Sequence, residues 1–189
     1  MRKTKANDSS QTSPESLEGL EEGSALPPEN VPLDDPSRRR LPPLLRRAWY
    51  SLNQAFRRRI AYSGLTPDQF TILRLLTESP PEGLTQRELA VLMSSDPNTI
   101  ASLLDRMQAA KLLERRPHES DRRAHRVKLL QKGKTVHAEL RDIAIKLQSE
   151  VLTALPPERR EQFLADLEAV AIACQAGAKA PLPAPQAEK

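Results

Sequence analysis

The sequence predicts a mainly α-helical fold with one small β-hairpin. Hydrophobic residues make up 38% of the 189 residues but aromatic residues only 3%. A core of Leu, Ile, Val and Ala favours helices, because sheets usually contain more β-branched and aromatic residues. Capping signatures at Thr66 and Thr85 mark two helix starts. Polar and apolar residues alternate over 126–129, which is typical of a half-buried strand.

The two ends of the chain differ from its middle in composition. Residues 1–37 hold 3 basic and 8 acidic residues and few apolar ones, so we expect a disordered acidic tail. Residues 179–189 are expected to form a second, Pro/Ala-rich tail. The remaining chain carries 26 basic and 17 acidic residues after residue 37. This excess suits either a nucleic-acid partner or an ordinary basic surface.

Several classes of site and location are disfavoured by the sequence. Cys174 is the one cysteine, so no intramolecular disulfide or cysteine-based metal cluster can form. The basic start has no apolar segment after it, and no apolar run reaches the ~20 residues of a membrane span. No phosphate loop, catalytic triad or metal-ligand spacing is present, so we expect no cofactor and no enzyme activity. We expect a soluble, cytoplasmic protein.

The first helix is predicted over 42–62, within an N-terminal helical segment at 38–62. An apolar stripe recurs at helical spacing through Leu45, Ala48, Trp49, Leu52 and Phe56. Arginines lie mostly off that stripe, at positions 46–47 and 57–59. This basic face suits solvent, phosphate contacts or a subunit interface.

Two short helices follow, and each begins with a capping box. Thr66 can cap a helix that has Pro67 first and Gln69 third. Thr85 and Glu88 repeat the box for a helix that ends near residue 93.

A fourth helix begins at Pro97, with Ser95 or Asp96 as its cap. Its apolar stripe is Ile100, Leu103, Leu104 and Met107. The opposite face carries small polar groups and one guanidinium, which suit base edges and phosphates in a major groove but equally suit water. These side chains are Asn98, Thr99, Ser102 and Arg106.

A β-hairpin, or wing, is predicted after the fourth helix. An extended segment begins at Leu112, a charged tip covers 118–125, and a strand follows over 126–129. Two further helices are predicted over 132–154 and after Pro157, within a segment at 131–178. Their apolar stripes have no evident partner in a small winged domain, so we expect them to pack with the first helix against a second copy, or alternatively as a bundle within one chain. The expected dimer residues are Leu45, Trp49, Leu52, Leu147, Val151, Phe163 and Leu167.

The segment 121–133, DRRAHRVKLLQKG, resembles the wing signature D-R-R-A-x-x-V-x-L-T-x-x-G of the MarR family of bacterial transcription regulators. Leu130 stands where that signature has Thr. Residues 85–90 and 103–107 also resemble the family's turn and recognition-helix region. The resemblance covers about 42–176 and implies a winged helix-turn-helix region at 63–130.

The resemblance implies a homodimer that binds double-stranded DNA at a near-palindromic operator. It further implies a repressor that a small anionic or phenolic molecule releases from DNA. Arg123, with Arg122 second, is expected to reach the minor groove, while Asp121 holds the wing in shape. The expected DNA-binding residues are Thr85, Gln86, Ser95, Asn98, Thr99, Ser102, Arg106, Arg122 and Arg123.

Two alternative functions remain open. A winged helix can serve protein contacts only, and a cysteine can make a regulator sensitive to oxidation. For Cys174 we expect a buried, inert thiol among the apolar residues of the last helix. The exposed face of the fourth helix also lacks the basic residue that the family often has near Ser102, so base reading would depend on Asn98, Thr99 and Ser102.

Overall fold

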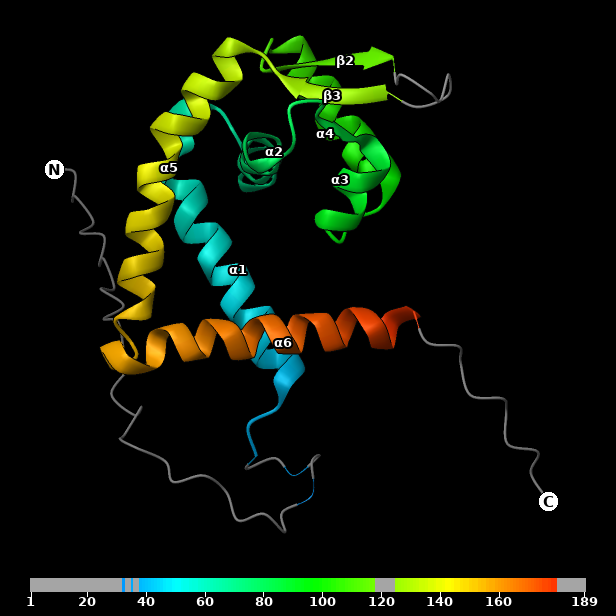
Figure 1. Ribbon diagram of the computed structural model, residues 1–189. Coiled ribbons are helices and arrows are strands. Elements are labelled where there is room, and N and C mark those ends of the chain that lie inside the picture. Colours follow the sequence, from blue (N-terminus) through cyan, green and yellow to red (C-terminus); the bar gives the residue numbers. More distant parts are fainter. Residues whose placement is uncertain (1–31, 33–34, 36–37, 118–124, 180–189) are drawn as a thin grey trace, which may run out of the picture. The chain divides into compact units, whose positions relative to one another are not determined.

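The computed structural model describes residues 32, 35, 38–117 and 125–179. The chain divides into two units between residues 45 and 46, and the contacts reported below lie within the second. The described elements, in chain order, are α1 Leu41–Arg59, η1 Ala61–Ser63, α2 Pro67–Glu78, β1 Leu84–Thr85, α3 Gln86–Leu92, α4 Pro97–Ala109, β2 Leu113–Pro117, β3 His125–Leu129, α5 Gln131–Leu152, η2 Pro157–Arg159 and α6 Arg160–Lys179 (Figure 1). The predicted fold, mainly helical with a small β-hairpin wing, is confirmed.

The sheet is antiparallel and has the strand order β1-β3-β2. β2 and β3 form the predicted hairpin, with Leu113 opposite Leu129. The sequence prediction missed β1, which pairs Leu84 with Val127. Two residues are too few to show an alternating pattern, and Thr85 also serves as the cap of α3. Residues 84–85 are therefore a strand only because they pair with β3, which is distant in the sequence.

The predicted helix starts are confirmed by their caps. The Thr66 side chain accepts a hydrogen bond from the Gln69 amide, and the Gln69 side chain accepts one from the Thr66 amide. Thr85 and Glu88 form the same reciprocal pair at α3. At α4 the cap is Asp96. Each cap satisfies amide groups that the first turn of a helix leaves without partners.

The larger buried cluster is the core of the winged domain. It joins α2, α3, α4 and the sheet, and excludes water from one side of each. Its fully buried side chains are Ile72, Leu73, Leu89, Ile100, Leu104, Met107, Leu113 and Val127. Because the predicted stripe of α4 lies in this core, the opposite side of α4 faces outward.

A second buried cluster joins α1, α2 and α5. Phe56 packs edge-on against Phe70, with ring centroids 4.9 Å apart, and Ile60 and Leu140 are fully buried beside them. For this part of α5 the structure shows the alternative that the sequence left open, a bundle within one chain. Leu147 is only 5% exposed within the single chain, which leaves little of it available to another subunit.

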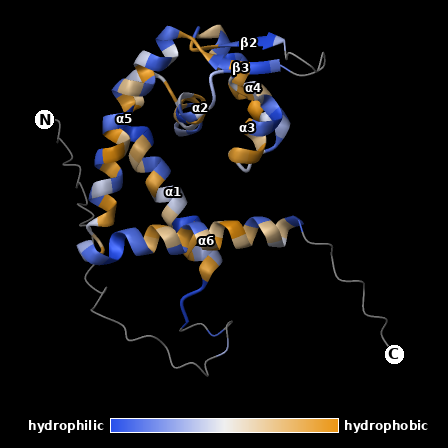
Figure 2. Ribbon diagram, in the orientation of Figure 1, coloured by the Kyte–Doolittle hydropathy of each residue, from blue (hydrophilic) through white to orange (hydrophobic). Residues whose placement is uncertain are grey.

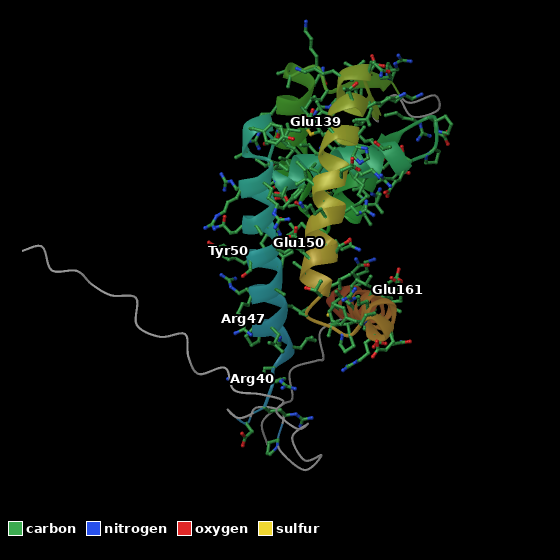
Figure 3. The ribbon with its side chains drawn as sticks, turned by 90° about the vertical axis from the view of Figure 1, so that its left-hand side faces the viewer. Arg40, Arg47, Tyr50, Glu139, Glu150 and Glu161 are labelled. Carbon is green, nitrogen blue, oxygen red and sulfur yellow. The ribbon has the colours of Figure 1, made fainter. Side chains whose placement is uncertain are left out.

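An ion pair also joins α1 to α5. Arg59 Nη2 lies 2.5 Å from Glu150 Oε2, and Figure 3 shows Glu150 beside α1 while Tyr50 lies on the side of α1 away from α5. The predicted first helix is three residues too long. α1 ends at Arg59, and a 3-10 turn follows before Gly64, whose φ of +70° reverses the chain.

Figure 2 shows hydrophobic residues along α1, α5 and α6. Several of their large apolar side chains are exposed, among them Trp49, Val151 and Phe163. No residue of Arg160–Lys179 is buried, so α6 contributes to neither cluster. Cys174 is exposed, which corrects the expected buried thiol, because α6 lacks a covering partner in the single chain. Within the described ranges no helix is long and apolar enough to cross a membrane.

Candidate nucleic-acid interface

The polar side of α4 is exposed as predicted. Asn98, Thr99, Ser102 and Arg106 are all exposed. The opposite side of the helix is held by the winged core, so these four side chains project from a fixed support. Arg106 Nε donates to the carbonyl oxygen of Ser102 at 3.1 Å, which draws the arginine along the helix surface. The result is a polar helix face that is free to meet a ligand.

The start of α4 is organised by Asp96. One carboxylate oxygen accepts from the amides of Asn98 at 2.6 Å and Thr99 at 3.1 Å. The other accepts from the Thr99 hydroxyl at 3.1 Å. These hydrogen bonds, first from the Thr99 amide and then from Asn98, lower the pKa of Asp96. The Thr99 hydroxyl proton is thus engaged, and toward a ligand this oxygen is an acceptor.

Two predicted DNA-binding residues support the turn between α3 and α4. Gln86 Nε2 donates to the Pro97 carbonyl oxygen at 3.2 Å, so it links the start of α3 to the start of α4. The Thr85 hydroxyl donates to the Glu88 carboxylate at 2.9 Å and accepts from the Glu88 amide. Ser95 is half-buried between the two helices. Whether these side chains also contact DNA stays a prediction.

The end of α4 is fixed by residues of the wing motif. Lys132 Nζ donates to the Ala110 carbonyl oxygen at 2.9 Å, where the helix leaves carbonyl groups without partners. Lys111 follows with φ +58°, and the chain then enters the sheet. A cation at this end also complements the helix dipole.

Arg115 on β2 is a contact that the sequence interpretation missed. Its Nη1 lies 2.7 Å from Asp105 Oδ1 and 3.2 Å from Gln108 Oε1, both on α4. Its Nη2 donates to the Ala101 carbonyl oxygen at 3.4 Å. The two-residue period of a strand could have predicted this inward position, because Arg115 lies on the same side of β2 as the buried Leu113.

The wing strands are described, but the tip of the wing is not. Asp121, Arg122 and Arg123 lie outside the described residues, so their predicted roles stay predictions. On β3, Arg126 Nη1 donates to the Gly83 carbonyl oxygen at 3.2 Å and ties the strand to the turn before β1. Gly83 has φ +83°, and a β-carbon there would lie 2.3 Å from the Val127 carbonyl oxygen.

No metal site is found within the part of the chain that the structure describes. His137 is 7% exposed, and Nδ1 lies 3.3 Å from Thr77 Oγ1. Its ring stacks on Phe70, with centroids 5.6 Å apart. It therefore belongs to the buried α1-α2-α5 cluster and not to a ligand set.

A helix pair, an exposed polar second helix and an antiparallel hairpin define the winged helix-turn-helix class. Residues 63–124 match the sequence profile of the MarR family. This segment is therefore similar to the MarR family, and it includes α2, α3, α4 and β2.

Solved structures are similar over most of the described chain. The transcriptional repressor CouR of Rhodococcus jostii, bound to a 23-mer DNA duplex, is 29% identical with a TM-score of 0.62, over 68% of this chain and 89% of CouR. The M. tuberculosis regulator MosR in complex with DNA is 29% identical with a TM-score of 0.57, over 69% and 95%. Bordetella bronchiseptica BpsR, whose DNA binding is regulated by 6-hydroxynicotinic acid, is 25% identical with a TM-score of 0.64, over 70% and 93%.

Proposed function

We propose that this protein is a dimeric repressor that binds near-palindromic promoter sites and is released from DNA by a small anionic or phenolic ligand. The observation that carries the proposal is the exposed polar face of α4, supported on its other side by the winged core. An α-helix of this kind fits the major groove of B-DNA, where amide and hydroxyl groups can read base edges. Asn98 is suited to adenine, since an amide can both donate and accept there.

DNA binding is supported by similarity to proteins solved on duplex DNA. CouR and MosR are both described in complexes with DNA, and each aligns with more than two thirds of this chain. In our proposal, α4 lies in the major groove and the tip of the wing reaches the neighbouring minor groove. Arg122 and Arg123 are the candidates for that second contact, because the narrow groove has the most negative potential.

Dimerisation is supported by the apolar side chains that the single chain leaves uncovered. On α1 and α6 these are Trp49, Leu52, Phe163 and Leu167, which are 64%, 43%, 43% and 38% exposed. Exposed apolar side chains gain free energy when a second copy covers them. Two-fold symmetry would then present two copies of α4 to half-sites about 34 Å apart, one turn of the duplex.

Release by a ligand is the third part of the proposal. The DNA binding of BpsR is regulated by 6-hydroxynicotinic acid, a small hydroxylated aromatic acid. A ligand of that chemistry releases DNA only if it binds better to a dimer whose helix spacing does not fit the operator. Its expected place in this protein is between the dimerisation helices and the winged domain.

The test is selection from a pool of random duplexes by the purified protein at near-physiological salt, followed by sequencing. We expect enrichment of a near-palindrome with half-sites about 10 base pairs apart, centre to centre. Calorimetry with a panel of aromatic acids, with and without that duplex, then tests the effector. Binding without enrichment that vanishes as salt rises would contradict a sequence-specific regulator. A protein-contact module would not be retained on duplex DNA at low salt.

A further inference from the structure

Arg115 contacts three acceptors along one flank of α4. Ala101, Asp105 and Gln108 follow each other at spacings of four and three residues, so they line a single side of the helix over two turns. At 100° per residue this flank lies between the buried stripe and the exposed polar face. One guanidinium on β2 therefore spans the flank of α4 between the core and the exposed polar face.

The core holds the buried side of α4 but leaves small rotations of the helix possible. Apolar contacts have no preferred direction, and buried methyl groups tolerate small turns and slides of a helix at modest cost. A guanidinium differs because its N–H groups diverge in one plane at fixed angles. The contacts at 2.7 Å to Asp105 and 3.2 Å to Gln108 thus set both the rotation of α4 about its axis and its position along β2.

We propose that Arg115 is a positioning residue for sequence recognition. It fixes the orientation in which α4 presents Asn98 and Ser102, and it couples α4 to the wing because β2 is a wing strand. This inference depends on the proposed DNA-binding function and adds to it the residue that sets specificity without touching a base. Bidentate contacts to bases demand accurate placement. A small rotation of α4 therefore reduces the discrimination between base sequences but leaves contacts to phosphate in place.

The neighbouring Arg116 provides a matched control. It lies on the other side of the same strand, its side chain is 60% exposed against 23% for Arg115, and it pairs with Glu114 at 2.5 Å. The two residues carry the same charge one position apart. Only Arg115 contacts the recognition helix, so a comparison of the two separates orientation from charge.

The experiment compares R115K and R116K in the full chain. Lysine keeps the charge but replaces the planar group by one that cannot hold three acceptors at these angles. For each protein, affinity is measured for the duplex selected by the wild type and for an unrelated duplex, over a range of salt concentrations. For R115K we expect the ratio of the two affinities to fall about tenfold or more, which is about 1.4 kcal/mol. Affinity for the unrelated duplex and its salt slope should stay unchanged, and R116K should match the wild type.

A second variant guards against loss of folding as the explanation. D105N keeps Arg115 and its contacts to Ala101 and Gln108 but removes the charged acceptor, and thermal unfolding checks each protein. We expect a smaller fall in the ratio for D105N, and R115K/D105N should lose less than the sum of the single variants because both act through one contact.

Two outcomes would overturn the inference. If R115K keeps the wild-type ratio, the contact serves stability alone. If both affinities fall by the same factor, Arg115 contributes to DNA binding directly and not through the orientation of α4. The wild-type arm reports on the proposed function separately, because a wild type without sequence preference would contradict that function whatever the variants show.

Discussion

Gly133 on α5 lies directly against the backbone of Leu112. A β-carbon placed on Gly133 would lie 2.1 Å from the Leu112 carbonyl oxygen, and the same oxygen accepts from the Leu130 amide at 3.0 Å. The start of α5 is thus pressed against the segment that leads from α4 into the wing. This contact gives a physical reason for the glycine that ends the wing motif.

We predict that G133A destabilises the fold. The obstructing atom belongs to the backbone, so it cannot rotate away as a side chain would, and relief requires moving α5 or the wing. Overpacking of this kind costs about 1–3 kcal/mol, which urea unfolding would measure as a lower midpoint. The matched control is G177A in α6, where no heavy atom lies within 4 Å of the added carbon. Alanine there should be neutral or stabilising by up to about 1 kcal/mol.

We predict that N98A weakens binding to the selected operator by a factor of about 5 to 150, equivalent to 1–3 kcal/mol, and leaves non-specific binding unchanged. The reason is the loss of an exposed amide at the start of α4 that can bond a base edge. Fluorescence anisotropy with the two duplexes would measure both affinities. T71A is the control, because the exposed Thr71 hydroxyl on α2 donates to the Pro67 carbonyl oxygen of its own helix and lies outside the proposed DNA contacts. Equal loss on both duplexes for N98A would argue against base reading by this residue.

We predict that R123A weakens binding to every duplex. A guanidinium in the minor groove displaces counterions, so its removal should reduce the slope of log affinity against log salt by about one. Affinities at four or five salt concentrations would give that slope. R159A, which removes an exposed arginine from η2, serves as control. An unchanged slope in R123A would remove this residue from the DNA contacts.

We predict that W49E shifts the protein from dimer to monomer. A carboxylate in the middle of an apolar interface must give up its hydration without gaining a partner, which is costly. Sedimentation at micromolar concentration would detect the change in mass. V91E is the control, because Val91 on α3 has the same exposed fraction of 64% as Trp49 but lies outside the predicted interface. A W49E protein that remains dimeric would place the interface elsewhere.

We predict that burial of His137 makes the protein less stable as pH falls through the range below 6.5. Desolvation by burial is the main cause that lowers the pKa of His137 from its ordinary value of 6.5. The unfolded chain therefore binds this proton more readily, and the free energy of unfolding is constant above 6.5 and declines as pH falls toward the folded pKa. Thr77 Oγ1 donates to the Leu73 carbonyl oxygen at 2.8 Å, so neutral His137 donates from Nδ1 to that hydroxyl.

Urea unfolding between pH 7.5 and 5 would test the prediction for His137. H137F, which keeps an aromatic ring against Phe70, should flatten the dependence in this range. Acidic groups with lowered pKa values, such as Glu150 beside Arg59, change the free energy of unfolding only at lower pH. Their contribution to stability is lost only as the carboxylate protonates. A wild-type midpoint that does not change between pH 6.5 and 5 would contradict the prediction.

The local elements were predictable because their signals lie within a few residues of each other. Thr66 and Gln69, or Thr85 and Glu88, form a capping box from four consecutive positions, and the structure confirms both. The apolar stripe of α4 likewise identified its buried side, and hence the exposed face with Asn98 and Ser102. The alternation over 126–129 identified β3, and the resemblance to the MarR family agrees with the family profile that matches residues 63–124.

The sequence by itself thus determined the order of the six helices and of β2 and β3, the caps of α2, α3 and α4, and the buried side of α4. The tertiary structure alone decided the pairing of β1 with β3, the burial of Leu147 against α1, and the contact of Arg115 with α4. Each of these joins residues that are far apart in the chain or on different elements. Periodicity reports only which side of an element is apolar, whereas the partner of that side depends on how the elements pack in space.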